Sequence, residues 1–274
     1  MRRAPDARGS QPRTPSACHM RPVTAITARC TVHCSCTTRR TVAVTRLVGV
    51  AREKAADKAI ESDSMDALQT VAIDASGALE EAVRALTAGG VIAFPTDTVY
   101  GLGAGLWQPE AIARLYAVKG RPDEKALPVL LADEEQWREV ATGASRAARR
   151  LMRAFWPGAL TLVLPRRPEV PDAVGPLTHT IALRVPDHAA LRRVLARAGP
   201  LASSSANRTG RPPATSAAGA RDELGRCIAL VLDGGTLSVR PPSTLVDLTG
   251  GEPLILRHGA VSADAIARAL SSSF

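Results

Sequence analysis

Aromatic residues are scarce in this 274-residue sequence, at 3% of the chain. We therefore expect no extended base-stacking surface of the kind that binds single-stranded nucleic acids. The hydrophobic core must instead be built from Ala, Val, Leu and Ile. No apolar run approaches the roughly 20 residues that cross a bilayer, so we expect no membrane-spanning segment. The 45% apolar and 22% charged content is typical of a globular protein.

Several common catalytic signatures are also missing. There is no P-loop, no G-x-S-x-G and no H-E-x-x-H. Gly101, Gly103 and Gly105 follow an apolar segment, but their spacing differs from the dinucleotide-binding pattern, and we interpret them as part of a loop. The histidines after residue 64 are isolated, so no histidine base is assigned. No cluster of acidic residues predicts a metal site made by the protein alone.

Cysteine is almost confined to the first quarter of the chain. Cys227 is the one cysteine after residue 64, which excludes a disulfide framework there. It opens the apolar run 227–232, and we interpret it as a buried strand residue rather than a nucleophile.

The positive charge is concentrated at the same end. Residues 1–64 hold 12 Lys and Arg against 5 Asp and Glu, whereas residues 65–274 hold 23 against 21. We predict a disordered basic extension over 1–64, upstream of a translation start at Met65 in one interpretation. Organelle import directed by residues 1–50 remains an alternative to a cytoplasmic location. A small metal or nucleic-acid arm, with Cys30, His33, Cys34 and Cys36 as ligands, is a further alternative.

From residue 65 onward, apolar segments of strand length alternate with helical patterns. The predicted strands lie near 91–94, 127–132, 160–164, 181–185, 200–203, 227–232, 243–248 and 253–257. Such alternation predicts a single α/β domain over 65–274. Because Gly250-Gly251 joins the last two strands as an antiparallel pair, we expect a mixed sheet with flanking helices.

Polar side chains gather where these strands begin and end, which is where open sheets bind ligands, and Lys119 and Arg121 follow the end of a helix. They are Thr96, Lys119, Arg121, Thr180, Arg184, Ser203, Ser205, Asn207, Ser243 and Arg257. Arg184 is the most informative, because a guanidinium inside an apolar strand needs an anionic partner. Thr96 and Ser243 can instead be turn residues, and Lys119 can stabilise a helix end. Together the cations and hydroxyls predict a pocket for phosphates and a carboxylate.

The same segments resemble the threonylcarbamoyl-AMP synthase family, also called YrdC-like, over about residues 75–265. The matching motifs are PTDTVYGLG at 95–103, KGRP at 119–122, WPGALTLVL at 156–164, ALRVPDH at 182–188, SSSANRTGRPPATSA at 203–217, DGG at 233–235, PSTLVD at 242–247 and LRHG at 256–259. The family's LRPG-like ending has His258 in place of proline here. Some relatives carry a further C-terminal domain beyond this ending.

The resemblance implies a twisted mixed sheet around a basic concave cavity. It also implies a nucleotidyltransferase that makes threonylcarbamoyl-AMP and pyrophosphate from L-threonine, bicarbonate and ATP. Mg²⁺ would arrive on ATP, with no dedicated protein metal site. The product would pass to a separate threonylcarbamoyl-transferase complex that modifies tRNA, and weak direct RNA binding remains open. The alternatives are a carbamoyl-adenylate-forming module and a noncatalytic domain that binds double-stranded RNA.

The resemblance also implies roles for individual residues. The catalytic set, which also contacts the nucleotide, is Lys119, Arg121, Ser205 and Asn207. The threonine-binding set is Thr96, Arg184, Ser203 and Ser243. Thr180 and Arg257 complete the nucleotide-binding set, and Lys125 resembles a second pocket lysine of some members.

Overall fold

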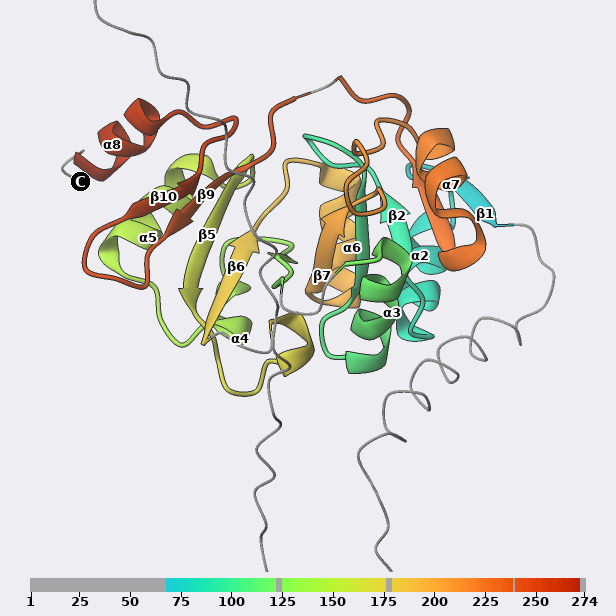
Figure 1. Cartoon of the computed structure of the whole chain (residues 1–274), viewed down its shortest axis with the longest axis horizontal. Helices are drawn as coiled ribbons and strands as arrows, with labels where there is room; N and C mark the ends of the chain where they lie inside the picture. Colours follow the sequence, from blue (N-terminus) through green and yellow to red (C-terminus); the bar gives the residue numbers. More distant parts are fainter. Residues whose placement is uncertain (1–67, 122–124, 176–178, 239, 272–274) are drawn as a thin grey trace, which may run out of the picture. The chain divides into compact units, whose positions relative to one another are not determined.

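The computed structural model describes residues 68–121, 125–175, 179–238 and 240–271, which all fall within one compact unit, Ala56–Phe274 (Figure 1). The predicted extension over 1–64 lies outside the described residues. The domain boundary at residue 65 therefore stays a prediction.

The described residues form a single mixed sheet of ten strands, in the order β1-β8-β2-β3-β7-β4-β6-β5-β9-β10. The strands are β1 Gln69–Ala72, β2 Ile92–Phe94, β3 Gly101–Gly105, β4 Val129–Leu130, β5 Leu160–Pro165, β6 Thr180–Arg184, β7 Leu201–Ser205, β8 Leu230–Asp233, β9 Thr244–Asp247 and β10 Leu254–Arg257. Four neighbouring pairs are parallel (β1–β8, β8–β2, β4–β6 and β5–β9) and five are antiparallel. The predicted antiparallel pairing of β9 with β10 is confirmed.

Helices connect the strands, and several of them begin at a side-chain cap. They are α2 Ala78–Thr87, α3 Pro109–Lys119, α4 Trp137–Val140, α5 Arg146–Phe155, α6 Ala189–Ala198, α7 Ala217–Leu224 and α8 Ala263–Ser271, with short 3₁₀ turns η1 Asp172–Val174 and η2 Gly225–Cys227. Ser145, Ser216 and Ser262 each accept a hydrogen bond from a backbone N–H of the first helical turn. Pro109 opens α3, and Gly120 closes it at a φ of 57°.

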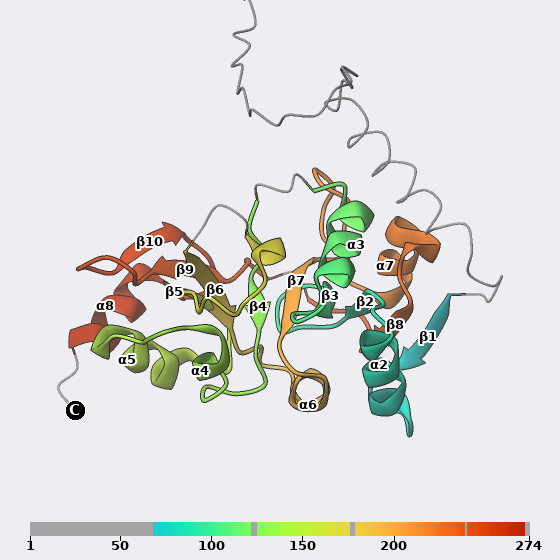
Figure 2. The same cartoon turned by 90° about the horizontal axis from the view of Figure 1, so that it is seen from below.

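The two faces of the sheet are covered differently along its length. One core packs α2 and α6 against β2, β7 and β8, and the larger core packs α3, α5, α7 and α8 against the other face. Figure 2 shows α4, α5 and α8 on one side of β5, β9 and β10, with no α-helix of the described part over the opposite side. This face of β6, β5, β9 and β10, which no α-helix of the described part covers, is called the open face below.

The glycines of β3 correct one sequence-based interpretation. Gly101–Gly105 is a strand in the middle of the sheet rather than a loop. A Cβ at Gly101 or Gly103 would lie 2.7 Å from the Phe94 ring of the paired strand β2. The missing side chains therefore make room for a fully buried aromatic ring. The strand was not predicted because its sequence alternates glycine with apolar residues and contains no β-branched residue.

Cys227 was also misplaced by the sequence analysis. It is exposed and belongs to the turn η2, while strand β8 begins only at Leu230. The apolar run 227–232 is long enough for a strand, but its first residues complete the turn after α7.

Within the described ranges, no helix combines the length and the apolar character that a membrane crossing requires. This finding agrees with the absence of a long apolar run in the sequence.

We predict that Gly103→Ala destabilises the fold by about 1–3 kcal/mol, because the added methyl group overlaps the buried Phe94 ring and lies 3.2 Å from Leu201. Urea denaturation followed by circular dichroism measures the change in the free energy of unfolding. The control is Gly143→Ala, since a Cβ there meets no atom within 4 Å. Equal stability of the two variants would contradict the packing role of Gly103.

Candidate functional site

Strand register aligns several site residues on the open face. Thr161 of β5 pairs with Leu245 of β9, and Leu245 pairs with Arg257 of β10. The antiparallel register of β6 with β5 brings Arg184 beside Thr161. Because residues paired across neighbouring strands point to the same face, the sheet itself sets Arg184 and Arg257 on one surface.

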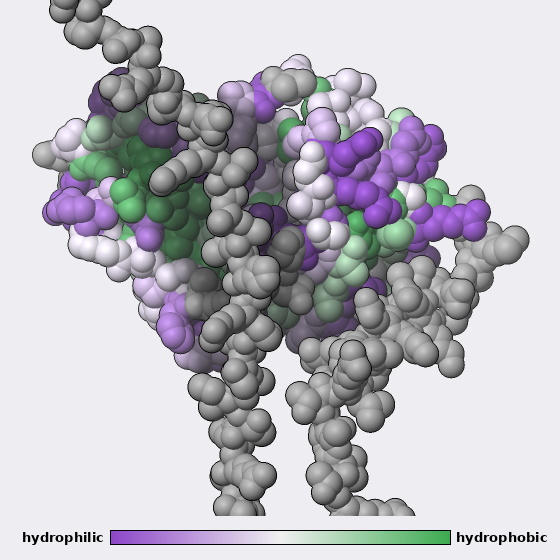
Figure 3. Space-filling view, viewed as in Figure 1, coloured by the Kyte–Doolittle hydropathy of each residue, from purple (hydrophilic) through white to green (hydrophobic). Residues whose placement is uncertain are grey.

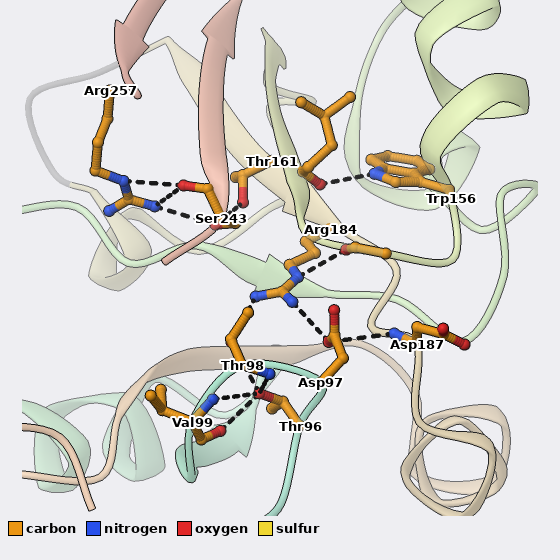
Figure 4. Close-up of polar contacts among 12 residues, drawn as sticks. Thr96, Asp97, Thr98, Val99, Trp156, Thr161, Arg184, Asp187, Ser243 and Arg257 are labelled. Carbon is orange, nitrogen blue, oxygen red and sulfur yellow. Dashed lines mark hydrogen bonds and ion pairs between the residues drawn. The ribbon is translucent and has the colours of Figure 1, made fainter. Parts of the chain in front are cut away.

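Arg184 has the anionic partner that its place in an apolar strand predicted. Its Nη2 donates to Asp97 Oδ1 at 2.6 Å, and the side chains of both residues are only 10% exposed. Its Nε donates to the Gly158 carbonyl at 3.0 Å, and Nη1 lies 3.4 Å from Thr98 Oγ1 (Figure 4). Three directions of the guanidinium are therefore fixed by the protein.

Thr96 is buried and organises the loop that presents Asp97. Its hydroxyl donates to the Val99 carbonyl at 2.6 Å and accepts from the backbone N–H groups of Thr98 and Val99 at 3.1 and 3.2 Å. These contacts form a tight turn after β2 (Figure 4). Because the hydroxyl proton is directed to Val99 and both lone pairs accept backbone N–H groups, the Thr96 hydroxyl has no hydrogen-bonding position left for a ligand in this arrangement.

Ser243 and Arg257 form a second contact group on the open face. Arg257 donates to the Ser243 carbonyl from Nε at 3.1 Å and from Nη2 at 2.8 Å, and Nη2 also contacts Ser243 Oγ at 3.0 Å. Ser243 Oγ lies 2.7 Å from Thr161 Oγ1. Desolvation, followed by the nearby charge of Arg184, lowers the pKa of Arg257. The contact holds with His258 in the position of the family's proline.

Close packing of two chain segments supports this pair. A Cβ at Gly259 would lie 2.1 Å from the Pro242 carbonyl oxygen and 2.7 Å from Thr244 N. The chain leaving β10 therefore touches the chain entering β9 through a glycine, just beside Arg257 and Ser243. The glycine is required for space, since no side chain fits there.

Lys119 joins the K-x-R and S-x-N motifs at a single nitrogen. Its Nζ contacts the Ser205 carbonyl at 2.7 Å, Ser205 Oγ at 3.2 Å, the Asn207 carbonyl at 2.9 Å and Asn207 Oδ1 at 3.0 Å. All four acceptors are neutral, and Lys119 is buried. Burial, with a smaller effect from Arg121, lowers the pKa of Lys119 to about 8.

Arg121 shapes the loop that follows α3. Its Nε donates to the Lys125 carbonyl at 3.0 Å, and Nη2 donates to the Ala126 carbonyl at 2.9 Å. Burial lowers its pKa, and its charge acts on Lys119. Lys125 contributes its backbone carbonyl here, and its ammonium group has no assigned role.

The remaining predicted residues are positioned by strands. Ser203 is buried on β7, where it pairs with Gly103 and donates its N–H to the Pro128 carbonyl at 2.8 Å. Thr180 begins β6 opposite Pro165 and, by alternation, faces the same side as Arg184.

The cations differ in how their charge is balanced. Arg184 contacts a carboxylate, whereas the contacts found for Lys119, Arg121 and Arg257 go to neutral oxygens. The three cations with neutral partners suit the negative charges of phosphates. No group of three or more His, Cys, Asp or Glu residues in the described part of the chain can hold a metal ion.

Asp97 is the residue that sequence reasoning missed. The PTDT segment was noted, but Thr96 was singled out as its ligand and Asp97 was left unassigned. The sequence contained enough information to find it. A guanidinium in an apolar strand needs an anionic partner, and Asp97 is an acidic residue just after a predicted strand.

Comparison with known proteins identifies the family. The family model Sua5_yciO_yrdC, described as "Telomere recombination", matches residues 84–259. A Mycobacterium tuberculosis protein named "Putative threonylcarbamoyl-AMP synthase" is 40% identical over 195 residues, which are 71% of this chain and 90% of that protein. A Bacillus subtilis protein named threonylcarbamoyl-AMP synthase is 37% identical over 193 residues, which are 69% of this chain and 55% of that protein.

A solved structure supports the same family assignment. The crystal structure of Pyrococcus abyssi Sua5 complexed with L-threonine superposes with a TM-score of 0.71 and 33% identity, over 75% of this chain and 61% of that one. This chain thus spans about three fifths or less of the Bacillus and Pyrococcus proteins, and most of the mycobacterial one. The predicted mixed α/β fold is confirmed, and the chain belongs to the Sua5/YciO/YrdC family.

Proposed function

We propose that this protein is an L-threonylcarbamoyladenylate synthase, which forms threonylcarbamoyl-AMP and pyrophosphate from L-threonine, bicarbonate and ATP. The observation that carries the proposal is the meeting of Lys119 with Ser205 and Asn207 around one nitrogen, within a family whose members include proteins named for this activity. Arg184 and Arg257 on the open face supply further cations.

The reaction proceeds in two bond-forming steps. The threonine amine attacks the carbon of bicarbonate and gives a carbamate with loss of water. A carbamate oxygen then attacks the α-phosphorus of ATP, the bond to the β-phosphate breaks, and pyrophosphate leaves. This transfer of an adenylyl group makes the protein a nucleotidyltransferase.

The protein contributes charge and position to these steps. Both reactants of the second step are anions, so Lys119, Arg121 and Arg257 offset their repulsion and stabilise the charge that builds on the phosphates. Arg184, fixed on three sides, presents its remaining N–H groups to the threonine carboxylate. We assign binding of the threonine side chain to the hydroxyls of Ser203 and Ser243. Holding both reactants in register supplies much of the rate enhancement.

Magnesium enters with its nucleotide in this proposal. Apart from Asp97, whose carboxylate contacts Arg184, the site residues are cations, hydroxyls and an amide, which are poor ligands for Mg²⁺, and the described residues offer no acidic cluster. MgATP is therefore the substrate form. The product passes to a separate threonylcarbamoyl-transferase system that acts on tRNA.

Pyrophosphate release by the full chain with MgATP and bicarbonate tests the proposal. We expect turnover that requires both bicarbonate and L-threonine, with L-valine inactive because it replaces the hydroxyl by a methyl group and leaves polar groups of the site unpaired. Release that continues without threonine, or that never occurs, would refute the synthase activity.

Arg121→Ala is expected to lower kcat/KM by about 100-fold or more while the protein stays folded, because one cation that stabilises phosphate charge is lost. Pyrophosphate release gives the rate, and circular dichroism gives the folded state. The matched control is Arg149→Ala, since Arg149 is an exposed arginine of α5 that also donates to a backbone carbonyl, that of Ala144. A near-normal rate for Arg121→Ala would remove it from the catalytic set.

Lys119 predicts opposite pH trends for activity and stability. Because its pKa is lowered from 10.5 to about 8, kcat/KM should fall as pH rises through about 8 and the charge is lost. Between these pKa values the unfolded chain binds the proton more readily, so the free energy of unfolding that Lys119 contributes rises with pH over the same range. In Lys119→Arg the fall of kcat/KM at alkaline pH should move to higher pH, since arginine stays charged. If the fall stays at the same pH, another group causes it.

A further inference from the structure

The Arg184–Asp97 ion pair uses only part of each group. A guanidinium has five N–H donors, and the three contacts of Arg184 occupy Nε and one hydrogen each of Nη1 and Nη2. Asp97 Oδ1 accepts both from Arg184 and from the backbone N–H of Asp187, at 2.6 and 3.3 Å. Among the described residues, Asp97 Oδ2 receives no hydrogen bond, and Figure 4 draws no contact to it. Two N–H donors of Arg184 and one carboxylate oxygen of Asp97, Oδ2, therefore have no partner among the described residues.

These groups belong to a guanidinium and a carboxylate, which carry opposite charges and contact each other directly. The α-carboxylate and α-ammonium of an amino acid are joined through a single carbon, so the protein groups that bind them must also be neighbours. A donor pair beside a carboxylate oxygen is complementary to that arrangement.

The surrounding charge makes the carboxylate necessary for such a ligand. Arg257 is close enough to Arg184 for their charges to interact, and a site assembled from arginines alone repels an ammonium group. Asp97 is the carboxylate that contacts Arg184 within the described residues. It supplies the one negative charge at this position against which a cationic group can rest.

The carboxylate is held in place before any ligand arrives. Asp97 follows Thr96, whose hydroxyl closes the turn onto Val99, and its Oδ1 is fixed from the other side by the start of the segment that leads into α6. Two separate backbone segments thus set the direction of Oδ2. Such preorganisation reduces the entropy lost on binding.

We infer that Asp97 determines specificity for the α-ammonium group, and that Asp97 and Arg184 together form a receptor for a zwitterionic α-amino acid. The α-carboxylate of the amino acid binds the remaining N–H groups of Arg184, and its α-ammonium binds Asp97 Oδ2. This inference rests on the proposed function, which names threonine as the amino acid. Asp97 acts on the bound zwitterion, and no proton transfer to it is involved.

The test compares L-threonine with (R)-3-hydroxybutyrate, which lacks only the amine. Isothermal titration calorimetry measures both dissociation constants for the full chain in saturating α,β-methylene-ATP, which cannot release pyrophosphate. The wild type should prefer threonine by about 10-fold or more, the value of one charge-assisted hydrogen bond. In Asp97→Asn that preference should collapse, with threonine weakened and 3-hydroxybutyrate unchanged or tighter. Asp187→Asn, a neighbouring exposed acid, should retain the preference.

Each outcome is decisive. Equal binding of the two ligands by the wild type overturns the inference without any variant, which covers the case in which Asp97→Asn fails to fold. Parallel weakening of both ligands in Asp97→Asn shows a structural role for Asp97 and also overturns it. A wild type that binds neither ligand rejects the threonine site itself, and with it the proposed function, whereas pyrophosphate release with an unaltered preference in Asp97→Asn rejects the inference alone.

Discussion

A guanidinium buried in a β-sheet needs a carboxylate, and that requirement organises this end of the molecule. Arg184 sits on β6 among apolar neighbours, and its contacts draw in Asp97 and Thr98 from the turn after β2 and Gly158 from the chain before β5. Asp97 in turn touches the backbone at Asp187. Removal of one partner from such a buried pair is strongly destabilising, because the remaining charge is left uncompensated. The Arg184–Asp97 ion pair therefore helps to hold the turn against the sheet.

The charge of Lys119, unlike that of Arg184, is not paired with a carboxylate of the described residues. Lys119 is surrounded by carbonyl, hydroxyl and amide oxygens rather than by an acid. Three N–H groups serve four acceptors, so the ammonium fixes the chain after β7 while its charge stays unneutralised. One cation is thus balanced and oriented, and the other is left to act at a distance. The proposed function uses this division, with the balanced cation at the amino acid and the unneutralised one at the phosphates.

The sequence predicted most of the elements that carry the site. Apolar runs located β2, β5, β6 and β9, and Pro109 with Gly120 bounded α3. It failed where a residue acts through a distant partner. Gly101–Gly105 forms a strand because Phe94 needs the space, and Cys227 is exposed because η2 interrupts its apolar run. Asp97 was passed over since its partner lies 87 positions away in sequence, a distance that no local pattern reports.

The site residues that sequence matching supplied also gained physical detail. Thr96, predicted as a ligand for threonine, has its hydroxyl proton directed into its own turn. Arg257 lies close to Ser243 although His258 replaces the family's proline. Local patterns identify which side chains are unusual, but the direction of each donor depends on the folded backbone.

The contact at Gly259 couples two parts of the site. Because the chain after β10 rests on the backbone of Pro242 to Thr244, Ser243 and Arg257 cannot shift independently. The β9–β10 pair therefore carries Ser243 and Arg257 as one unit, joined by this contact and by the hydrogen bonds between the two residues. Leu254 and Leu256 are exposed apolar side chains on the edge strand β10, and Figure 3 shows an apolar area at the left of the molecule. A displacement of the edge strand β10 would therefore be transmitted to Ser243 as well as to Arg257.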